Sequence, residues 1–171
     1  LYRYIIIMTI RKKDIEKIKV DTKKLEYSSY AHSVVMDEMI KHIDTKYAVI
    51  CDSDIAFLHK NWDIDFINMI NEKNILVGGE SNHTTYFFPH IYMAFFNAEK
   101  FKKINVTFAP IKNCPEFVDK YKIKINDDNK NYDVEIPDEL VKYYNIKNFY
   151  ADTSSMLPYI LRKNGYDGIS L

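Results

Sequence analysis

The sequence lacks most of the features that would place it at once in a specialised class of protein. Its 24 basic and 24 acidic residues cancel to a formal net charge of zero, which argues against a nucleic-acid-binding protein, since such proteins usually carry excess positive charge. No apolar run approaches the roughly 18 residues of a membrane-spanning helix, so we expect no membrane span. Only two cysteines occur, Cys51 and Cys114, and we therefore expect a reducing compartment and no disulfide scaffold.

Several enzyme motifs are absent as well. With only four glycines, the chain contains no P-loop and no G-x-G-x-x-G fingerprint, and it has neither a Ser-His-Asp array nor cysteine pairs spaced for zinc. Arginine is scarce, so we expect no bidentate arginine clamp on a diphosphate apart from Arg3, Arg11 or Arg162. Those enzyme classes receive no support from the sequence.

What the chain does contain is an ordinary globular composition with regularly spaced apolar segments. Its 171 residues, of which 47% are hydrophobic, are enough to bury a core without disulfides. The alternation of strands and helices in the first half predicts an α/β fold with a mostly parallel sheet flanked by helices. Predicted strands lie at 4–10, 47–51, 75–77 and 91–96. Predicted helices lie at 28–43, after a capping Asn61, at 98–104 behind a capping Asn97, at 137–144 and at 154–163.

The second half of the chain is less regular than the first. Residues 112–135 mix lysine, asparagine, aspartate and tyrosine with scattered apolar residues, and this predicts either a long loop or a small antiparallel excursion. Pro137 suits the first position of a helix. We expect one domain over residues 1–171, either abbreviated at its N-terminus or part of a longer chain.

Two carboxylates follow the second predicted strand: Asp52 and Asp54, separated by Ser53. Ligands of open α/β sheets gather beyond the carboxyl ends of the strands. Two carboxylates placed there repel each other unless a cation or sugar hydroxyls satisfy them, and Mg²⁺ or Mn²⁺ binds carboxylate oxygen while bridging to a nucleotide's phosphates. The pair therefore predicts a divalent metal site, and the alternative is a solvated turn with two acidic residues.

Residues 28–168 resemble the GT-A-fold glycosyltransferases, in particular bacterial and viral members. The resemblance rests on an ordered set: a helix, an apolar strand ending in Asp-x-Asp, a helix that contains Trp62, a short strand, and Gly78-Gly79. Residues 89–97 look like the acceptor-side strand of that family. Asp152-Thr153-Ser154 is similar to an Asp-Thr-Gly element that opens a helix in many of its members.

The resemblance implies a Rossmann-like fold that binds a nucleotide-sugar, short at its N-terminus. It implies transfer of a hexosyl or pentosyl group from a UDP- or GDP-sugar to a hydroxyl of a glycan or another acceptor, with Mn²⁺ or Mg²⁺ as cofactor. Asp54 would coordinate the metal directly, and Asp52 would contact the donor ribose or hold the metal through water. The metal would act as Lewis acid on the diphosphate leaving group. Retention and inversion both stay open, and the expected location is the cytoplasm, of a host cell if the protein is viral.

Five further residues are candidates for the site. Asp152 would be the general base for the acceptor hydroxyl, or a helix cap, and Glu80 would be a rival base or an exposed loop acid. His90 would bind acceptor or supply a third metal ligand, with a hydrogen-bonded loop residue as its structural alternative. His32 would contact the base or phosphate of the donor, while Trp62 would stack on a sugar or pack its helix onto the sheet.

Two other functions compete with the transferase. A haloacid-dehalogenase-like phosphatase also uses Asp-x-Asp after a buried strand, but that family prefers Thr or Val where this chain has Ala56, and it places the motif on the first strand. The other alternative is a catalytically idle GT-A-like module that only binds. Neither nucleic acid nor a membrane is an expected partner.

Overall fold

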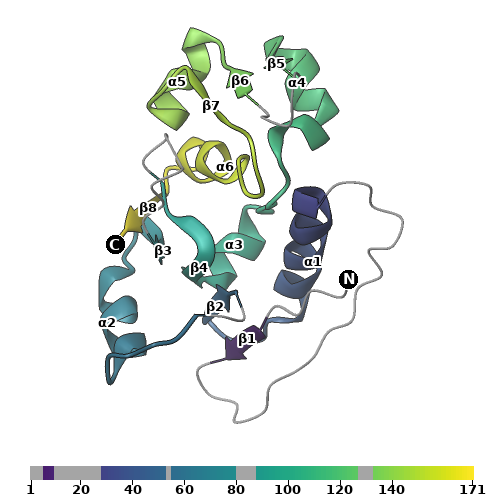
Figure 1. Cartoon of the computed structure of the whole chain (residues 1–171). Helices are drawn as coiled ribbons and strands as arrows, with labels where there is room; N and C mark the ends of the chain where they lie inside the picture. Colours follow the sequence, from purple (N-terminus) through teal and green to yellow (C-terminus); the bar gives the residue numbers. More distant parts are fainter. Residues whose placement is uncertain (1–5, 10–27, 53–54, 80–87, 127–132) are drawn as a thin grey trace.

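The computed structural model describes residues 6–9, 28–52, 55–79, 88–126 and 133–171, which form a five-stranded and a three-stranded sheet with helices around them (Figure 1). The five-stranded main sheet has the strand order β1-β2-β4-β3-β8. Its strands are β1 (Ile6–Thr9), β2 (Tyr47–Cys51), β3 (Asn74–Gly79), β4 (His90–Asn97) and β8 (Asp167–Ser170).

The α/β class is confirmed, but the prediction of a mostly parallel main sheet is wrong. Strand β4 is antiparallel to both of its neighbours, β2 and β3, and β1 is antiparallel to β2, so β3–β8 is the one parallel pair among the described strands. Strands β2 and β3 do run in the same direction, as their strand-helix-strand spacing suggested. They are not neighbours, however, because β4 returns between them. Only residues 80–89 join β3 to β4, fewer than the dozen or so that a parallel crossover needs.

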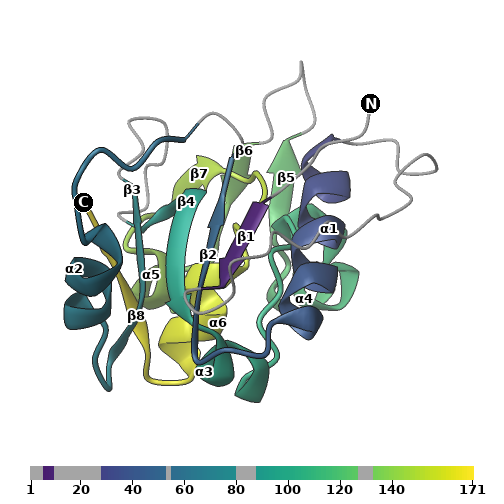
Figure 2. The same ribbon diagram turned by 90° about the horizontal axis from the view of Figure 1, so that it is seen from below.

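Helices cover both faces of the main sheet, and Figure 2 shows α1 and α2 on opposite sides of its strands. Helix α1 (Ser28–His42) buries the apolar stripe that its sequence predicted, and it packs on the same face as α3 (Ala98–Lys103) and α6 (Leu157–Lys163). On the other face, α2 (Trp62–Met69) lays Phe66 against Phe95 of β4, with ring centroids 5.5 Å apart.

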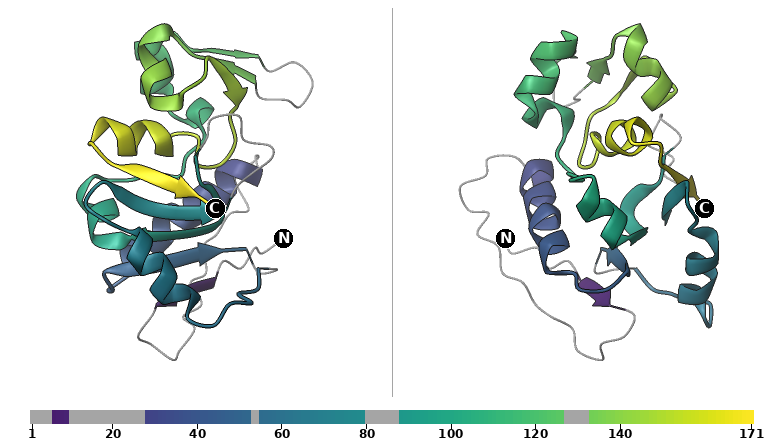
Figure 3. Two further views of the ribbon diagram at one scale, coloured as in Figure 1. Left: turned by 90° about the vertical axis from the view of Figure 1, so that its left-hand side faces the viewer. Right: turned by 180° about the vertical axis from the view of Figure 1, so that it is seen from behind.

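The three-stranded sheet belongs to the irregular second half of the chain, where an antiparallel excursion was one of two predictions. Its order is β5-β6-β7 and both pairs are antiparallel. Helix α6 lies between this sheet and the main sheet (Figure 3), and buried side chains of both sheets belong to one hydrophobic cluster. The elements of this part are η1 (Ile111–Asn113), α4 (Pro115–Tyr121), β5 (Lys124–Asn126), β6 (Asp133–Glu135), α5 (Asp138–Tyr144) and β7 (Asn148–Tyr150).

The helices begin only in part where the sequence predicted. The Asn97 side chain accepts from the Lys100 amide, as predicted for the cap of α3. Asn61 does precede α2, but it adopts a left-handed conformation (φ 64°) and makes no capping hydrogen bond with its side chain. Pro137 lies one position ahead of α5, and α6 begins at Leu157 after a turn, instead of at Ser154. Among the helices of the described segments, none combines the length and apolar character needed to cross a membrane.

Candidate active site at the carboxyl end of the main sheet

Several chain segments meet at one end of the main sheet. Strands β2, β3 and β8 run in the same direction and end there, while β4 begins there, with Cys51 opposite Met93 and Gly79 opposite His90. We call this the carboxyl end of the sheet. Helices α1 and α6 each lead through a short turn into a strand that ends here, so both helices also begin at this end. Ligand sites of open α/β sheets occupy this position.

Asp52 directly follows β2 at the carboxyl end. Its backbone N–H donates to the Tyr92 carbonyl at 2.8 Å, and its own carbonyl accepts from the Ile55 N–H at 3.1 Å. These bonds hold the backbone of a half-buried residue whose carboxylate has no hydrogen-bond or ion-pair partner among the residues that the structure describes. A carboxylate with spare acceptor capacity suits a divalent cation or ligand hydroxyls.

The cysteine before Asp52 is not a candidate nucleophile. Cys51 is buried, and burial, followed by the charge of Asp52, raises the pKa of its thiol. A thiol with a raised pKa stays protonated near neutral pH and is a poor nucleophile.

His90 begins β4, next to the end of β3. The Tyr92 N–H donates to His90 Nδ1 at 3.3 Å, so in the neutral ring the proton lies on Nε2. The rings of His90 and Tyr92 are 5.1 Å apart and inclined by 34°. Both side chains are half-buried, which gives this end of the sheet an aromatic surface.

The two glycines that end β3 lie close against other groups. A Cβ on Gly78 would be 2.7 Å from Pro89 Cβ, and a Cβ on Gly79 would be 1.9 Å from Tyr92 Oη. In the sequence analysis, Gly78-Gly79 was one part of the ordered set that resembles the GT-A fold. Because glycine at a strand end also marks close approach of another group, the pair was the signal that could have led to Tyr92, which the sequence analysis missed.

Asp152 lies in the turn before α6 and His32 lies in α1, and both helices begin at the carboxyl end. The Thr153 hydroxyl donates to the Ser29 carbonyl at 3.0 Å, which ties the turn before α6 to the first turn of α1. Asp152 accepts from the Thr153 N–H at 2.6 Å, and since α6 begins only at Leu157, Asp152 is not the cap of that helix. His32 is half-buried in the first turns of α1.

Trp62 packs its helix onto the other face of the sheet. Its ring stacks on Phe57 with a centroid distance of 3.7 Å and meets the edge of Phe66 at 5.6 Å. These contacts match the packing alternative, and stacking of Trp62 on a sugar stays a prediction.

Two predicted site residues, Asp54 and Glu80, lie outside the described residues. Within the part of the chain that the structure describes, no three His, Cys, Asp or Glu side chains are grouped closely enough to hold a metal ion. Of the predicted acidic pair, Asp52 is described, and its unpartnered carboxylate is the kind of hard oxygen ligand that Mn²⁺ or Mg²⁺ takes. The described residues thus fit one ligand of the predicted metal site.

Comparisons with models of protein families, with curated protein sequences and with solved protein structures found no match in any of the three.

Proposed function

We propose that this chain is a metal-dependent glycosyltransferase that moves a sugar from a nucleoside-diphosphate sugar to an acceptor hydroxyl. One observation carries the proposal. Four residues singled out from separate parts of the sequence, at positions 32, 52, 90 and 152, lie on elements that meet at the carboxyl end of the main sheet. Two other histidines, His42 and His59, are exposed and pair with Glu38 and Asp65.

The proposed roles follow from the chemistry at each position. Asp52 would hold the cation, directly or through water, or the ribose of the donor, together with Asp54. Bound there, Mn²⁺ or Mg²⁺ would neutralise charge on the departing diphosphate. Asp152, which comes from the helix side of the same end, would accept the proton of the acceptor hydroxyl, with Glu80 as the rival base.

The charge balance of the chain is consistent with this assignment. The chain has a net charge of zero and few arginines, and a single divalent cation would supply the charge that holds the diphosphate in place of a basic surface. The proposal therefore requires the metal for donor binding. It includes a GT-A-like, nucleotide-sugar-binding arrangement, built on the mixed sheet described above.

Calorimetric and thermal-shift titrations test the proposal. The ligands are UDP, GDP and their sugar conjugates, each with Mn²⁺, with Mg²⁺ and with EDTA. A ligand at about 100 times its Kd stabilises the native state by about 2.7 kcal/mol, so a raised Tm is expected only with nucleotide and metal together. Hydrolysis of a generic phosphoester without any nucleotide-sugar would contradict the transferase and favour the phosphatase. Metal-dependent binding without hydrolysis or transfer over a panel of acceptors would favour the idle binding module.

A further inference from the structure

The turn before α6 holds a serine in a backbone conformation that favours glycine. The Ser155 N–H donates to the Asp152 carbonyl at 3.1 Å and closes a β-turn whose third residue is Ser154. Ser154 has a φ of 68°, and a turn with a positive φ at its third residue prefers glycine or asparagine there. The other described non-glycine residues with a positive φ are three asparagines and Lys122, all of them exposed. A buried serine in this conformation carries a cost that needs an explanation.

The hydrogen bonds that hold this turn do not use the side chain of Ser154. Its N–H donates to the Phe108 carbonyl at 2.6 Å, and its carbonyl accepts from the Leu157 N–H at 2.8 Å. The hydroxyl of the preceding Thr153 donates to the Ser29 carbonyl at 3.0 Å. A glycine at position 154 would keep all three bonds and would adopt the turn more easily. The fold therefore does not explain why this position carries a hydroxyl.

The Ser154 hydroxyl is also the exception among the buried polar side chains of the described residues. Four of the five make a hydrogen bond with their side chain: Ser33, Asn97, Thr153 and Ser155. Ser154 is 5% exposed, and its hydroxyl has no hydrogen-bond partner in the part of the chain that the structure describes. A hydroxyl in this state has given up bonds to water without gaining others. A ligand that reaches it would gain a hydrogen bond.

The proposed base lies two positions earlier in the same turn and has a carboxylate oxygen to spare. Oδ1 of the half-buried Asp152 accepts from the Thr153 N–H at 2.6 Å, and Oδ2 has no partner among the described residues. An ionised carboxylate only accepts hydrogen bonds, whereas a serine hydroxyl both donates and accepts. A ligand with several hydroxyl groups, such as a sugar, can satisfy both groups of the turn.

We infer that the hydroxyl of Ser154 binds a sugar acceptor, beside the acceptor hydroxyl that Asp152 deprotonates. One hydroxyl of the acceptor bonds to Ser154. Another gives its proton to Asp152 while its oxygen bonds to the anomeric carbon of the donor sugar, and the bond from that carbon to the diphosphate breaks, so that its electron pair leaves with the diphosphate. The inference rests on the proposed function and goes beyond it, because it names the class of acceptor and assigns Ser154 to it.

The test separates transfer to a sugar from transfer to water. With Mn²⁺, the donors UDP-glucose, UDP-galactose, UDP-N-acetylglucosamine and GDP-mannose are each combined with glucose, galactose, mannose or N-acetylglucosamine as acceptor. Transfer and donor hydrolysis are measured for the pair with the highest rate. Ser154→Ala removes the hydroxyl, so kcat/KM for the acceptor should fall about fivefold to tenfold. Donor hydrolysis and the Kd of the donor should stay within twofold, since water needs no second hydroxyl contact.

Ser154→Gly separates the hydroxyl from the backbone conformation. It removes the same hydroxyl and should lower kcat/KM for the acceptor as far as Ser154→Ala does. Its Tm should lie above that of Ser154→Ala, because glycine adopts the positive φ without strain. If Ser154→Ala does not fold, Ser154→Gly carries the comparison. The matched control is Lys122→Gly, which relieves a φ of 50° at the end of α4 and should leave the acceptor kinetics unchanged.

Three results would overturn the inference while the proposed function stands. The first is that Ser154→Gly leaves kcat/KM for the acceptor unchanged. The second is that it weakens donor binding or hydrolysis as much as transfer, which would place Ser154 on the donor. The third is that the wild-type chain hydrolyses a donor but transfers to none of the sugars. If the wild-type chain neither binds nor hydrolyses any donor with the metal, the proposed function fails and the inference fails with it.

Discussion

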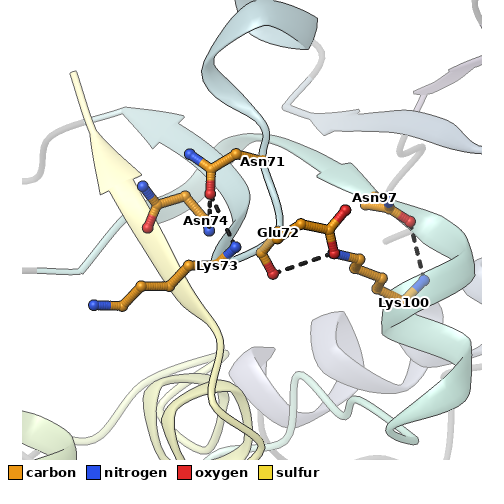
Figure 4. A network of polar contacts seen from close by, with 6 residues as sticks. All are labelled: Asn71, Glu72, Lys73, Asn74, Asn97 and Lys100. Atoms are coloured by element: carbon orange, nitrogen blue, oxygen red, sulfur yellow. Dashed lines mark hydrogen bonds and ion pairs between the residues drawn. The ribbon is translucent and has the colours of Figure 1, made fainter.

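Among the described residues, acids at the two ends of the main sheet differ in their partners. At the end opposite the carboxyl end, the turn between α2 and β3 and the start of α3 form a closed network (Figure 4). Asn71 Oδ1 accepts from the Lys73 and Asn74 N–H groups at 2.9 and 2.8 Å, and Lys100 Nζ lies 3.0 Å from Glu72 Oε2. The polar groups drawn there serve the local fold.

At the carboxyl end, two acids of the described residues, Asp52 and Asp152, provide the contrast. The Asp52 carboxylate has no partner among the residues that the structure describes, and Asp152 bonds within its own turn. A group that already has its hydrogen bonds gains little from a ligand, so the half-buried Asp52 carboxylate keeps acceptor capacity that the partnered groups have used. Variants of partnered groups should therefore cost stability, and variants of Asp52 should cost binding.

The largest effect is expected for Asp52→Asn. Loss of the charge should weaken binding of UDP with Mn²⁺ by at least about a hundredfold, while the Tm moves little because no described partner loses a bond. Calorimetry and a thermal melt measure the two quantities. Asp65→Asn, an exposed acid on α2 paired with His59, is the matched control. A large fall in Tm for Asp52→Asn with unchanged UDP binding would reverse the comparison.

Asp37 offers the opposite case, a carboxylate with partners. It accepts from the Thr107 hydroxyl at 2.6 Å and from the Phe108 N–H at 2.7 Å, which ties α1 to the segment that leads into the small sheet. Asp37→Ala should lower the free energy of unfolding by about 2 kcal/mol, and nucleotide binding should change only as far as the fold does. Urea denaturation at neutral pH measures the loss, and a value near zero would contradict it.

The same residue gives a pH dependence. Burial raises the pKa of the Asp37 carboxyl above its ordinary value of 3.8, although its hydrogen bonds to Thr107 and Phe108 act in the other direction. The folded chain therefore holds this proton more tightly than the unfolded chain. The Asp37 contribution to stability is most favourable below pH 3.8 and is lost as the pH rises through the raised pKa. Asp37→Asn should remove this part of the pH dependence in a series of urea titrations, and parallel curves for the two proteins would contradict it.

A smaller loss is expected at the cap of α3. Asn97 Oδ1 accepts from the Lys100 N–H at 3.0 Å, and replacing a capping residue with alanine typically costs about 1 kcal/mol. Asn97→Ala should lower the Tm by a few degrees and leave nucleotide binding unchanged. Asn164→Ala at the end of α6, where the side chain donates to the Ile160 carbonyl on the surface, should do less. An equal loss at the two positions would argue against a capping role for Asn97.

The smallest effect is expected for Glu72→Gln in the Figure 4 network. The hydrogen bond from Lys100 lowers the pKa of this exposed carboxyl. The pair therefore contributes fully above the ordinary pKa of glutamate, and this contribution is lost as the pH falls through the lowered value. Exposed pairs are screened by water and salt, so the Tm at neutral pH should not change measurably. A clear fall in Tm that added salt does not diminish would contradict this prediction and show that the Glu72–Lys100 pair contributes to the stability of the fold.

Local patterns predicted the elements whose signals are contained in the sequence around them. The stripe Val35, Met36, Met39 and Ile40 lies buried along α1, and the apolar run Tyr47–Cys51 forms β2. The Asn97 cap is present. Each of these depends on the periodicity or hydrogen bonding of a few neighbouring residues.

The same local patterns could not predict which strands pair with each other. The insertion of β4 between β2 and β3 depends on which strands meet in space, and a strand of the same composition could have added at either edge of the sheet. Strand β8, with the sequence Asp-Gly-Ile-Ser, carries almost no alternation or apolar run, so it becomes a strand only because β3 offers it an edge. The contact of Tyr92 with Gly79 joins positions 13 residues apart across a sheet register with an irregularity.

The sequence by itself determined the α/β class, most of the helices, the buried strands and the identity of the polar residues worth testing. Those properties follow from side-chain chemistry and from periods of two and 3.6 residues, which are local. Tertiary structure decided the mixed direction of the sheet, the bond that ties the turn before α6 to the first turn of α1, and the contact of Tyr92 with Gly79. These depend on the close packing of segments far apart in the chain, and no local pattern contains that information.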